Sequence, residues 1–598
     1  MSDRNHRRAA SVPTDPVQPL EARRLMSFTA IGRPDLLSGV TRSTDLAVAG
    51  DGSYYVAYVN AVRSPSLNRD VNVLSVQRYD ARGLAAGDAL LISRYVAPGT
   101  FVSIDASAGS QAVVTYVERR GAADALSFTR LSASGIGSSV RFFESPAGLL
   151  RDNGQPVLDG ADVSMTDDGG FFLAHRVAGG ESLRTSYVEP GFDTNLDDVL
   201  ALEPASELYA TLGNFGIAAR PDGSGAVFVA DTAGGGGDRI LFATVGTTTK
   251  TSSNRTLGTV GADLAQPVIA ADGSRYVIAY TRGGTSDAFG GQRVFAQVVG
   301  QGGILQGAAI AVSEGISTSN AFETLNPSIS FVPSSFVTGA NGFAVGFVRT
   351  DVNGNTAAYA RRYDFNGTPD ESGAVYVAPS VTAATEVGHD GSGNAVIAYR
   401  TPPARGVSAI ATRRLTNGII LDGREVYAIG TGQNDRILID GESSPEGRVR
   451  VTAGTLARSY PGRQVAAVSV LGLEGNDRID HVSVVPATLS GGAGADVILG
   501  GPSSDLILGD SGSDFLYGNG GNDRIDGGGN SDRVRGGDGD DTLLGGAGGG
   551  KDLLFGDPGN DLLTGGAGTD RLFGGTGDDR GTRDDRDLFD GIETVVRR

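Results

Sequence analysis

The side chains best placed to do chemistry in this sequence are aspartates that recur at a fixed spacing near its C-terminus. Each follows the one before by nine residues, except that eleven separate Asp541 from Asp552. An aliphatic residue stands two positions after each of the first nine. Evenly spaced carboxylates offer the oxygen ligands that Ca²⁺ prefers. We therefore predict calcium ligation by Asp496, Asp505, Asp514, Asp523, Asp532, Asp541, Asp552, Asp561, Asp570 and Asp579.

These aspartates take the sixth position of nonapeptides of the form G-G-x-G-x-D-x-U-x, in which U is aliphatic. Some copies depart from this form, at Pro502-Ser503, at Asn530 and after Asp579, where no aliphatic residue follows. Glycine lets the backbone adopt left-handed turns and direct its carbonyl groups inward. We expect such carbonyl oxygens to complete the calcium sites. Three well-preserved copies supply the candidates Gly491, Gly492, Gly494, Gly536, Gly537, Gly539, Gly565, Gly566 and Gly568.

This phased array resembles the RTX, or hemolysin-type, calcium-binding repeat family over about ten tandem copies. The resemblance implies a parallel β-roll in which six residues of each repeat form a turn and three form a short strand. Alternate repeats would lie on opposite sides, with Ca²⁺ held between successive turns by Asp carboxylates and glycine carbonyls. We accordingly expect residues 491–581 to form the roll and residues 582–598 to cap its end.

Electrostatics gives an independent reason to expect a cation. Neighbouring strands lie about 4.8 Å apart, and carboxylates at that spacing repel by roughly 3–4 kcal/mol per pair at an effective dielectric of 20. The aliphatic column makes too thin a core to hold the segment alone, so folding and calcium binding should be one event. The alternative is that the aspartates only cap turns by hydrogen bonds to nearby backbone.

A different repeat precedes the aspartate column, over residues 28–429. A short apolar strand, a glycine turn and a second apolar strand recur, as in Leu46–Tyr58 and Val268–Tyr280. Asp-Gly between apolar runs is a strong hairpin signal. Seven units of three or four strands predict an all-β chain that begins with a seven-bladed β-propeller, although a row of β-sandwich domains is an alternative. The turn glycines are Gly52, Gly109, Gly169, Gly223, Gly273, Gly342 and Gly391.

Two further segments flank this repeat domain. Residues 430–490 contain two degenerate nonapeptides, Gly430–Ile437 and Gly472–Ile479, and we expect a β-helical adaptor there. Residues 1–27 are polar and basic, which predicts disorder. Within them, Pro19–Ser27 resembles the LEPRxLL motif found near the N-terminus of many predicted surface or exported planctomycete-type proteins. In this sequence Ala22 replaces the motif's Pro, and Met26 replaces its second Leu.

Composition narrows the possible partners. The net charge of the chain is −19, and residues 491–598 alone hold 21 acidic and 10 basic residues. Such a segment repels nucleic acid and anionic membranes, so neither is an expected partner. No apolar run approaches the length needed to span a bilayer. The absence of cysteine excludes disulfides and thiolate metal sites.

Catalytic motifs are not found. The four histidines, His6, His175, His389 and His481, form no HExxH motif, and neither a G-x-S-x-G elbow nor a P-loop lysine is present. His175 and His389 fall in propeller units and could line a channel, but a lone histidine beside strand residues is more often structural.

Two functions remain open. The first is a non-enzymatic, calcium-stabilised protein of the extracellular space or cell surface, whose propeller is a structural scaffold or binds a surface protein or polysaccharide. Calcium loops of extracellular modules often bind at about 10⁻⁴–10⁻³ M, which would leave them empty in cytosol. The second is a secreted hydrolase or lyase with an acidic site in the propeller channel. Propellers host both kinds of function, so the fold alone does not decide.

Overall fold

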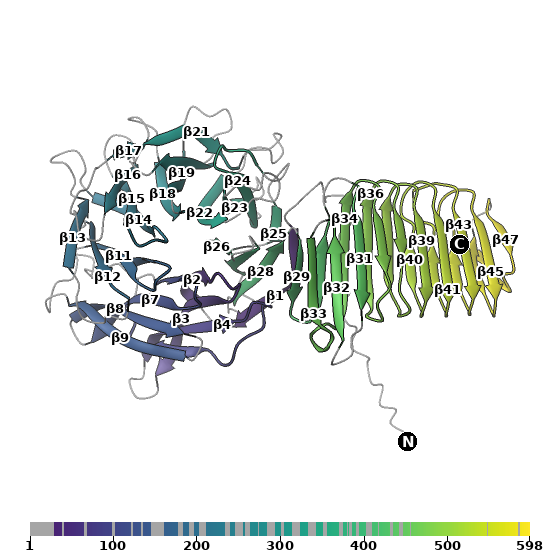
Figure 1. The fold of residues 1–598 in the computed structure, drawn as a ribbon, viewed down its shortest axis with the longest axis horizontal. Coiled ribbons are helices and arrows are strands. Elements are labelled where there is room, and N and C mark those ends of the chain that lie inside the picture. The colour runs from purple at the N-terminus through teal and green to yellow at the C-terminus, as the bar shows by residue number, and fades with distance from the viewer. Residues whose placement is uncertain are drawn as a thin grey trace, which may run out of the picture.

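The computed structural model describes residues 29–597 apart from connecting segments, the longest of which is 145–160. The motif at Pro19–Ser27 lies outside the described residues. Strands dominate the described part, with one short 3₁₀ turn at Gly462–Gln464. Figure 1 shows a ring of small sheets joined to an elongated stack of strands. Nothing that the structure describes is a helix long and apolar enough to cross a membrane.

The ring is a seven-bladed β-propeller of four-stranded antiparallel sheets, as the sequence predicts. Blades one to three consist of β2 (Thr41–Val48), β3 (Tyr54–Ser64), β4 (Arg69–Tyr79), β5 (Leu90–Ser93); β6 (Ser103–Ala106), β7 (Ala112–Arg120), β8 (Ala123–Ser132), β9 (Gly135–Glu144); and β10 (Ala161–Met165), β11 (Phe171–Arg176), β12 (Leu183–Val188), β13 (Asp197–Leu202). Blades four to six consist of β14 (Thr211–Ala219), β15 (Ala226–Ala233), β16 (Ile240–Val245), β17 (Arg255–Leu257); β18 (Leu264–Ala271), β19 (Arg275–Arg282), β20 (Arg293–Gly300), β21 (Leu305–Ala311); and β22 (Glu323–Val332), β23 (Gly342–Thr350), β24 (Thr356–Asp364), β25 (Val375–Pro379).

The seventh blade closes the ring with a strand from the other end of the domain. It contains β26 (Thr385–His389), β27 (Ala395–Arg400), β28 (Ala409–Thr416) and β1 (Thr29–Ser38). The outermost strand, β1, pairs antiparallel with β28, in a register that places Leu37 opposite Ile410. The first strands of successive blades pack beside one another around the ring, from β2 through β6 and β10 to β26 and back to β2.

Glycine turns join the first two strands of several blades where the sequence predicts them, whereas Gly342, also predicted as a turn glycine, is the first residue of β23. Gly52, Gly169 and Gly223 lie between these strands with φ of 83°, 89° and 71°, a region that favours glycine. The second strands then cross the blade interior and are almost wholly buried, as in Tyr54–Val59. A propeller buries such small sheets because each face packs against the neighbouring blade.

The elongated stack consists of two ten-stranded sheets that face each other (Figure 1). We call them the even sheet and the odd sheet after the numbers of their later strands. The even sheet contains β29 (Ile419–Asp422), β30 (Glu425–Ile429), β34 (Ala467–Glu474), β36 (Ala487–Ala493), β38 (Leu506–Ser511), β40 (Arg524–Asp526), β42 (Thr542–Leu544), β44 (Leu562–Thr564), β46 (Arg580–Arg583) and β48 (Thr594–Arg597). The odd sheet contains β33 (Leu456–Pro461), β32 (Arg448–Ala453), β31 (Arg436–Gly441), β35 (Arg478–His481), β37 (Val497–Leu499), β39 (Phe515–Gly520), β41 (Arg533–Asp538), β43 (Leu553–Pro558), β45 (Arg571–Thr576) and β47 (Leu588–Asp590).

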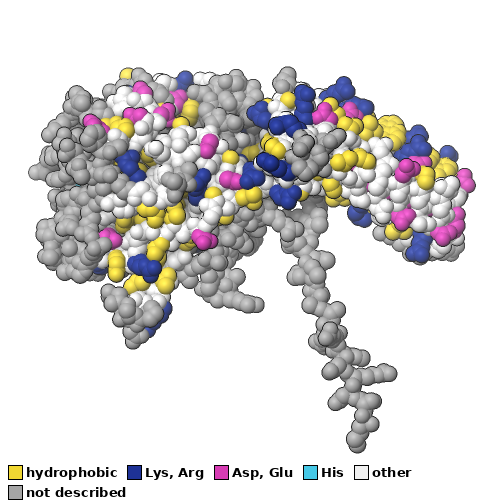
Figure 2. All heavy atoms as spheres, turned by 60° about the horizontal axis from the view of Figure 1, so that its bottom comes forward, with side chains coloured by type: hydrophobic (Ala, Val, Ile, Leu, Met, Phe, Trp, Pro, Cys, Tyr) yellow, Lys and Arg dark blue, Asp and Glu magenta, His cyan; other side chains and the backbone are white. Residues whose placement is uncertain are grey.

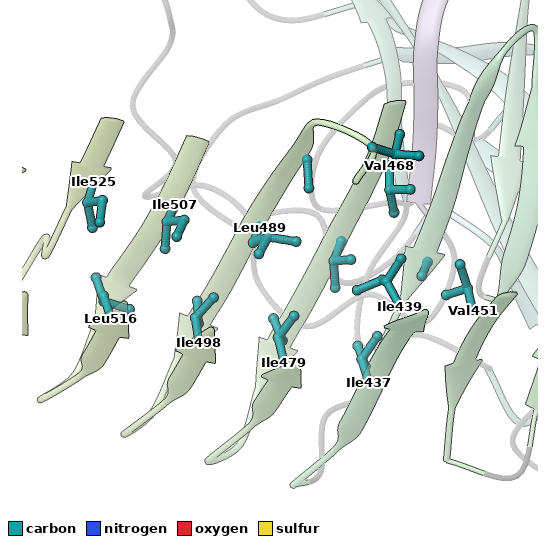
Figure 3. Close-up of a cluster of buried hydrophobic side chains, with 14 of the residues drawn as sticks. Ile437, Ile439, Val451, Val468, Ile479, Leu489, Ile498, Ile507, Leu516 and Ile525 are labelled. Carbon is teal, nitrogen blue, oxygen red and sulfur yellow. The ribbon is translucent and has the colours of Figure 1, made fainter. Parts of the chain in front are cut away.

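Within the odd sheet, β31, β32 and β33 follow one another and pair antiparallel. From β34 onward the chain alternates between the two sheets, and same-sheet neighbours pair in parallel. Ile498 pairs with Leu516 in the odd sheet and Ile507 with Ile525 in the even sheet. From β37 to β45 one aliphatic side chain per strand points inward, whereas β31 contributes two, Ile437 and Ile439. All of them belong to a single continuous core, part of which Figure 3 shows. The expected parallel β-roll is therefore confirmed.

Candidate metal centre

Each aspartate of the repeat stands at the entrance to a short strand. Asp496 directly precedes β37, and Asp505 precedes β38 on the opposite side of the roll. The aliphatic residue two positions later is fully buried, so the strand fixes where the carboxylate before it lies. All ten predicted aspartates are at most 4% exposed. Burial of a carboxylate is costly unless hydrogen bonds or a counter-charge compensate it.

One oxygen of each carboxylate joins a ladder that runs along the roll. The N–H of Asp496 donates to Oδ1 of Asp514 at 2.8 Å, and that of Asp505 donates to Oδ1 of Asp523 at 2.8 Å. The bond recurs on both sides, and it spans 20 rather than 18 residues where the eleven-residue step intervenes, as from Asp532 to Asp552. The ladder ends on acidic residues outside the nonapeptides, since Asp579 N–H donates to Glu593 at 2.6 Å.

The second oxygen is the feature that indicates a ligand. Among the described residues, Oδ2 is buried and accepts no hydrogen bond in Asp477, Asp496, Asp514, Asp523, Asp532, Asp541, Asp561 and Asp579. A buried acceptor without a partner costs about 1–3 kcal/mol, and more when it is charged. Such a cost, repeated along a column, favours a site completed by a cation.

The first glycine of each nonapeptide borders this oxygen. A Cβ at Gly518 would lie 2.2 Å from Asp523 Oδ2 and 2.5 Å from the carbonyl oxygen of Gly536 in the next turn. A Cβ at Gly556 would lie 2.3 Å from Asp561 Oδ2 and 2.3 Å from the Gly574 carbonyl oxygen. Carboxylate and carbonyl oxygens therefore converge where only glycine leaves room, and they are the ligand types that Ca²⁺ selects.

Within the described part of the chain, no three acidic or histidine side chains converge closely enough to hold a metal by themselves. Each cation would consequently take backbone carbonyl oxygens as well as carboxylates. The second and fourth glycines of the nonapeptide turn those carbonyls, because Gly492 and Gly494 have φ of 103° and 141°, and Gly537 and Gly539 have φ of 115° and 134°.

The remaining predicted glycines occupy equivalent positions. Gly491, Gly536 and Gly565 border Oδ2 of the aspartate in their own repeat. Gly566 has φ of 97°, and a Cβ on Gly568 would lie 2.9 Å from Asp570 Oδ1.

Without a counter-ion, the column resists ionisation. Burial first, and then the charges of neighbouring aspartates, raise the pKa of Asp514 to about 8 and the pKa of Asp523 to about 7. Burial likewise raises the pKa of Asp552 and of Asp561 to about 7, again with a contribution from nearby carboxylates. A divalent cation removes both causes, since it neutralises the repulsion and replaces the lost hydration.

The sequence predictions omit one member of the column. Asp477 precedes β35, its Oδ2 has no partner among the described residues, and burial raises its pKa to about 7. Its N–H donates to Asp496 Oδ1 at 2.7 Å, so it continues the same ladder. The degenerate copy Gly472–Ile479 contains the signal that could have identified it, because Ile479 stands two positions after Asp477.

Comparison with known families agrees with this geometry. The model of the RTX calcium-binding nonapeptide repeat matches residues 488–516, 517–549 and 547–580. The chain carries RTX repeats. RTX nonapeptide repeats bind Ca²⁺, and the matched residues coincide with the turns and strands of the roll. No curated protein matches the chain.

Solved structures similar to the chain include several propellers. An ulvan lyase of polysaccharide lyase family PL25 is 10% identical, covers 63% of this chain and 95% of its own, and gives a TM-score of 0.40. The β-propeller domain of the trilobed protease from Pyrococcus furiosus is 8% identical with 63% and 94% covered and a TM-score of 0.36. The α-L-arabinofuranosidase Arb93A from Fusarium graminearum is 10% identical with 66% and 98% covered and a TM-score of 0.35.

The propeller holds a second group of carboxylates, on the first strands of its blades. Asp45, Asp105 and Asp162 each accept a backbone N–H from the first strand of the following blade, at Ile104 (2.7 Å), Met165 (2.8 Å) and Ile217 (2.8 Å). These bonds fasten neighbouring blades together. Glu386 on β26 belongs to the same group, and burial followed by the charges of Asp45 and Asp162 raises its pKa well above the usual range.

The histidines of the propeller lie apart from one another. His175 is fully buried on β11, the second strand of its blade, where it pairs with Ala161 and Arg184. His389 ends β26 and is also buried, and burial with the charge of Arg362 lowers its pKa to about 3. It is therefore neutral at physiological pH.

Proposed function

We propose that this chain is a calcium-stabilised protein of the extracellular space or cell surface, whose RTX roll folds around Ca²⁺ and whose propeller is a structural or binding scaffold. The observation that carries the proposal is the column of buried Oδ2 atoms without partners. Nine of the ten predicted aspartates remain the proposed carboxylate ligands, with Asp477 added from the structure: Asp496, Asp514, Asp523, Asp532, Asp541, Asp552, Asp561, Asp570 and Asp579. Asp505 is the exception, because its Oδ2 already accepts the Gly501 N–H.

Calcium supplies positive charge between stacked turns and does no chemistry on a substrate. The residues of the chain position the oxygens: the buried aliphatic column fixes the strands, and the glycine turns direct the carbonyl groups. Because weak calcium loops are filled only where calcium is abundant, the proposed function places the folded roll outside the cell.

Hydrogen exchange on the full-length chain tests the proposal. In millimolar Ca²⁺ the amides of β37–β45 should be protected, and in excess chelator with Mg²⁺ they should exchange rapidly. Equal protection of these strands under both conditions would show that the aspartates only cap turns.

A second candidate is a hydrolase or lyase that acts in the propeller channel. It is supported by Glu386, whose raised pKa keeps a proton available near Asp45 and Asp162, as a general acid requires. Against it, Asp45, Asp105 and Asp162 already bind the next blade through their oxygens. Release of reducing ends from a polysaccharide panel that Glu386→Gln abolishes would favour the enzyme over the scaffold.

A further inference from the structure

The outer face of the odd sheet differs in composition from the rest of the roll. Outward residues flank each buried aliphatic side chain, because successive side chains point to opposite faces of a strand. From β37 to β45 the residues directly beside the aliphatic one include no carboxylate, although residues 491–598 hold 21 acidic residues in all. These outward residues are Val497, Leu499, Phe515, Tyr517, Arg533, Arg535, Leu553, Phe555, Arg571 and Phe573. One carboxylate, Asp557 farther along β43, pairs with Arg535.

The side chains of this face form two aligned columns. Parallel pairing places Phe515 beside Arg533 and Phe555 beside Phe573. The Phe555 and Phe573 rings stack with their centroids 4.8 Å apart and an angle of 6° between their planes. The Arg533 guanidinium lies over the Phe555 ring, 5.2 Å from its centroid. The result is a row of stacked aromatic rings and guanidinium groups along β39–β45.

Part of this row faces solvent. Phe515 is 47% exposed, and Arg533 and Arg571 are also exposed. Figure 2 shows hydrophobic and Lys or Arg side chains next to one another along the roll. Arg535 pairs with Asp557, whereas Arg533 and Arg571 have no acidic partner among the described residues. A sheet face that meets only water is expected to be polar, so exposed aromatic rings beside these two arginines indicate a binding surface.

We propose that the outer face of the odd sheet binds an extended anionic polysaccharide that runs along the roll axis. The exposed ring of Phe515 and the outer edges of the stacked Phe555 and Phe573 rings offer apolar surface for the C–H groups of sugar rings. Arginine pairs with carboxylate or sulfate groups in a planar, bidentate way. The rung spacing of about 4.8 Å is comparable with the length of one pyranose unit in an extended chain. Calcium aids the interaction, because it cancels the charge of the aspartate column that would otherwise repel a polyanion.

Binding of defined polymers to the full-length chain in millimolar Ca²⁺ tests this proposal. Oligogalacturonate tests carboxylate recognition, a carrageenan oligosaccharide tests sulfate recognition, and neutral dextran is the uncharged comparison. The variants Phe555→Ala/Phe573→Ala and Arg533→Ala/Arg571→Ala should each weaken binding about tenfold or more, which corresponds to roughly 1.4 kcal/mol. Arg524→Ala and Leu562→Ala change the outer face of the even sheet and should leave binding unchanged.

The calcium-induced folding of every variant serves as an internal check, since the substituted side chains all lie outside the core. Absence of binding to both anionic polymers overturns the proposal, as does equal loss in the even-sheet variants. Concentration-dependent self-association that the same odd-sheet variants abolish would also overturn it, because the occupant would then be a second copy of the chain.

A separate observation concerns Asp505, which differs from the other aspartates of the column. Its Oδ2 accepts the N–H of Gly501 at 2.8 Å and lies 3.3 Å from Nδ1 of His481. The His481 ring is buried, with Nε2 3.0 Å from the Ser483 hydroxyl, and a Cβ on Gly501 would lie 2.7 Å from the ring. The imidazole thus occupies the space beside this carboxylate oxygen.

The backbone of this turn differs as well. In the other turns of the nonapeptide array, the second or the fourth residue has positive φ, for example Asn519 at 71° and Gly521 at 103°. The equivalent residues Gly501 and Ser503 are not among the described residues with positive φ. The carbonyl groups of this turn therefore lack the orientation that the other turns share.

We infer that the turn at Gly500–Asp505 is a calcium-free cap at the start of the even-side column, in which His481 replaces the cation. This inference rests on the proposed calcium binding by the other turns. It implies that Asp505 is a structural acceptor, and that the roll begins on a segment already held together by side chains.

The number of calcium ions bound by the full-length chain distinguishes the two kinds of turn. Asp523→Asn should reduce that number, whereas Asp505→Asn should leave it unchanged. His481→Ala should lower the melting temperature equally with and without calcium, and His481→Gln, which can still donate to Asp505, should restore part of the loss. An equal loss of calcium in Asp505→Asn and Asp523→Asn would overturn the cap. No loss in either variant would overturn the proposed function itself.

Discussion

The propeller and the roll both place aspartates between neighbouring repeats, but they satisfy the carboxylates differently. In the propeller, Asp162 accepts the Val163 N–H (3.0 Å) and the Ser103 hydroxyl (2.7 Å) on Oδ1, and the Ile217 N–H (2.8 Å) on Oδ2. In the roll, Asp523 accepts a single N–H on Oδ1, and its buried Oδ2 accepts none among the described residues.

The difference indicates which repeat array can fold without a ligand. The propeller supplies donors for Asp45, Asp105 and Asp162 and closes its ring through β1. In most of its turns the roll leaves one buried acceptor for an external cation, and from β37 to β45 its core has one aliphatic side chain per strand. Two domains of one chain therefore couple to calcium to very different degrees.

Removal of calcium should separate the two domains most clearly. With excess chelator at neutral pH, the strands β37–β45 should lose all protection from hydrogen exchange, whereas β3 and β7 should keep theirs. Binding and folding are one event in the roll only. If the propeller strands lost protection to the same extent, the contrast between the domains would be wrong.

Acid should partly replace calcium in the roll. The pKa of Asp514 is about 8 and that of Asp532 about 6 in the folded, calcium-free state, against about 3.9 for an unfolded aspartate. The folded state thus binds protons more tightly, so its stability is greatest below about pH 4 and is lost as pH rises through about 6–8. Circular dichroism in chelator should show more β-structure at pH 4.5 than at pH 7.5.

Calcium should reverse this dependence, because protons then compete with the cation for the same oxygens. A calcium-loaded roll that is more stable at pH 4.5 than at pH 7.5 would contradict the assignment of these aspartates.

A single methyl group should distinguish the metal-facing glycine from its neighbour in the same strand. In Gly518→Ala the new Cβ meets Asp523 Oδ2 at 2.2 Å, whereas in Gly520→Ala its nearest contact is the Pro502 Cα at 3.8 Å. Neither glycine has positive φ, so backbone strain does not confuse the comparison. Gly518→Ala should raise the calcium midpoint of folding severalfold, and Gly520→Ala should not. Equal midpoints for both variants would remove Gly518 from the site.

The sequence predicts the roll more completely than the propeller. The nonapeptide phase fixes the strands, the inward aliphatic residues and the aspartate turns together, because one short local motif encodes all three. The motif also predicts Asp477 as a ligand when its degenerate copy, Gly472–Ile479, is counted. The blades are encoded by weaker local signals, chiefly glycine hairpins such as the one at Gly52.

Long-range contacts explain what the sequence does not predict. The pairing of β1 with β28 joins the two ends of the domain, and no local pattern specifies it. No local pattern specifies the contact of His481 with Asp505 either, because the two residues lie 24 apart in sequence. This contact fills the space beside the carboxylate oxygen of Asp505.

The smallest expected effect concerns the bonds between propeller blades. Asp162→Ala removes the acceptor of the Ser103 hydroxyl and of the Val163 and Ile217 N–H groups, which should cost about 1–3 kcal/mol of propeller stability. Because no cation is involved, the loss should be the same in calcium and in chelator, as measured by the propeller's melting temperature. Asp222→Ala, in an exposed hairpin turn, is the matched control and should change that temperature little. A loss for Asp162→Ala that appears only in chelator would show that the propeller, too, depends on a bound ion.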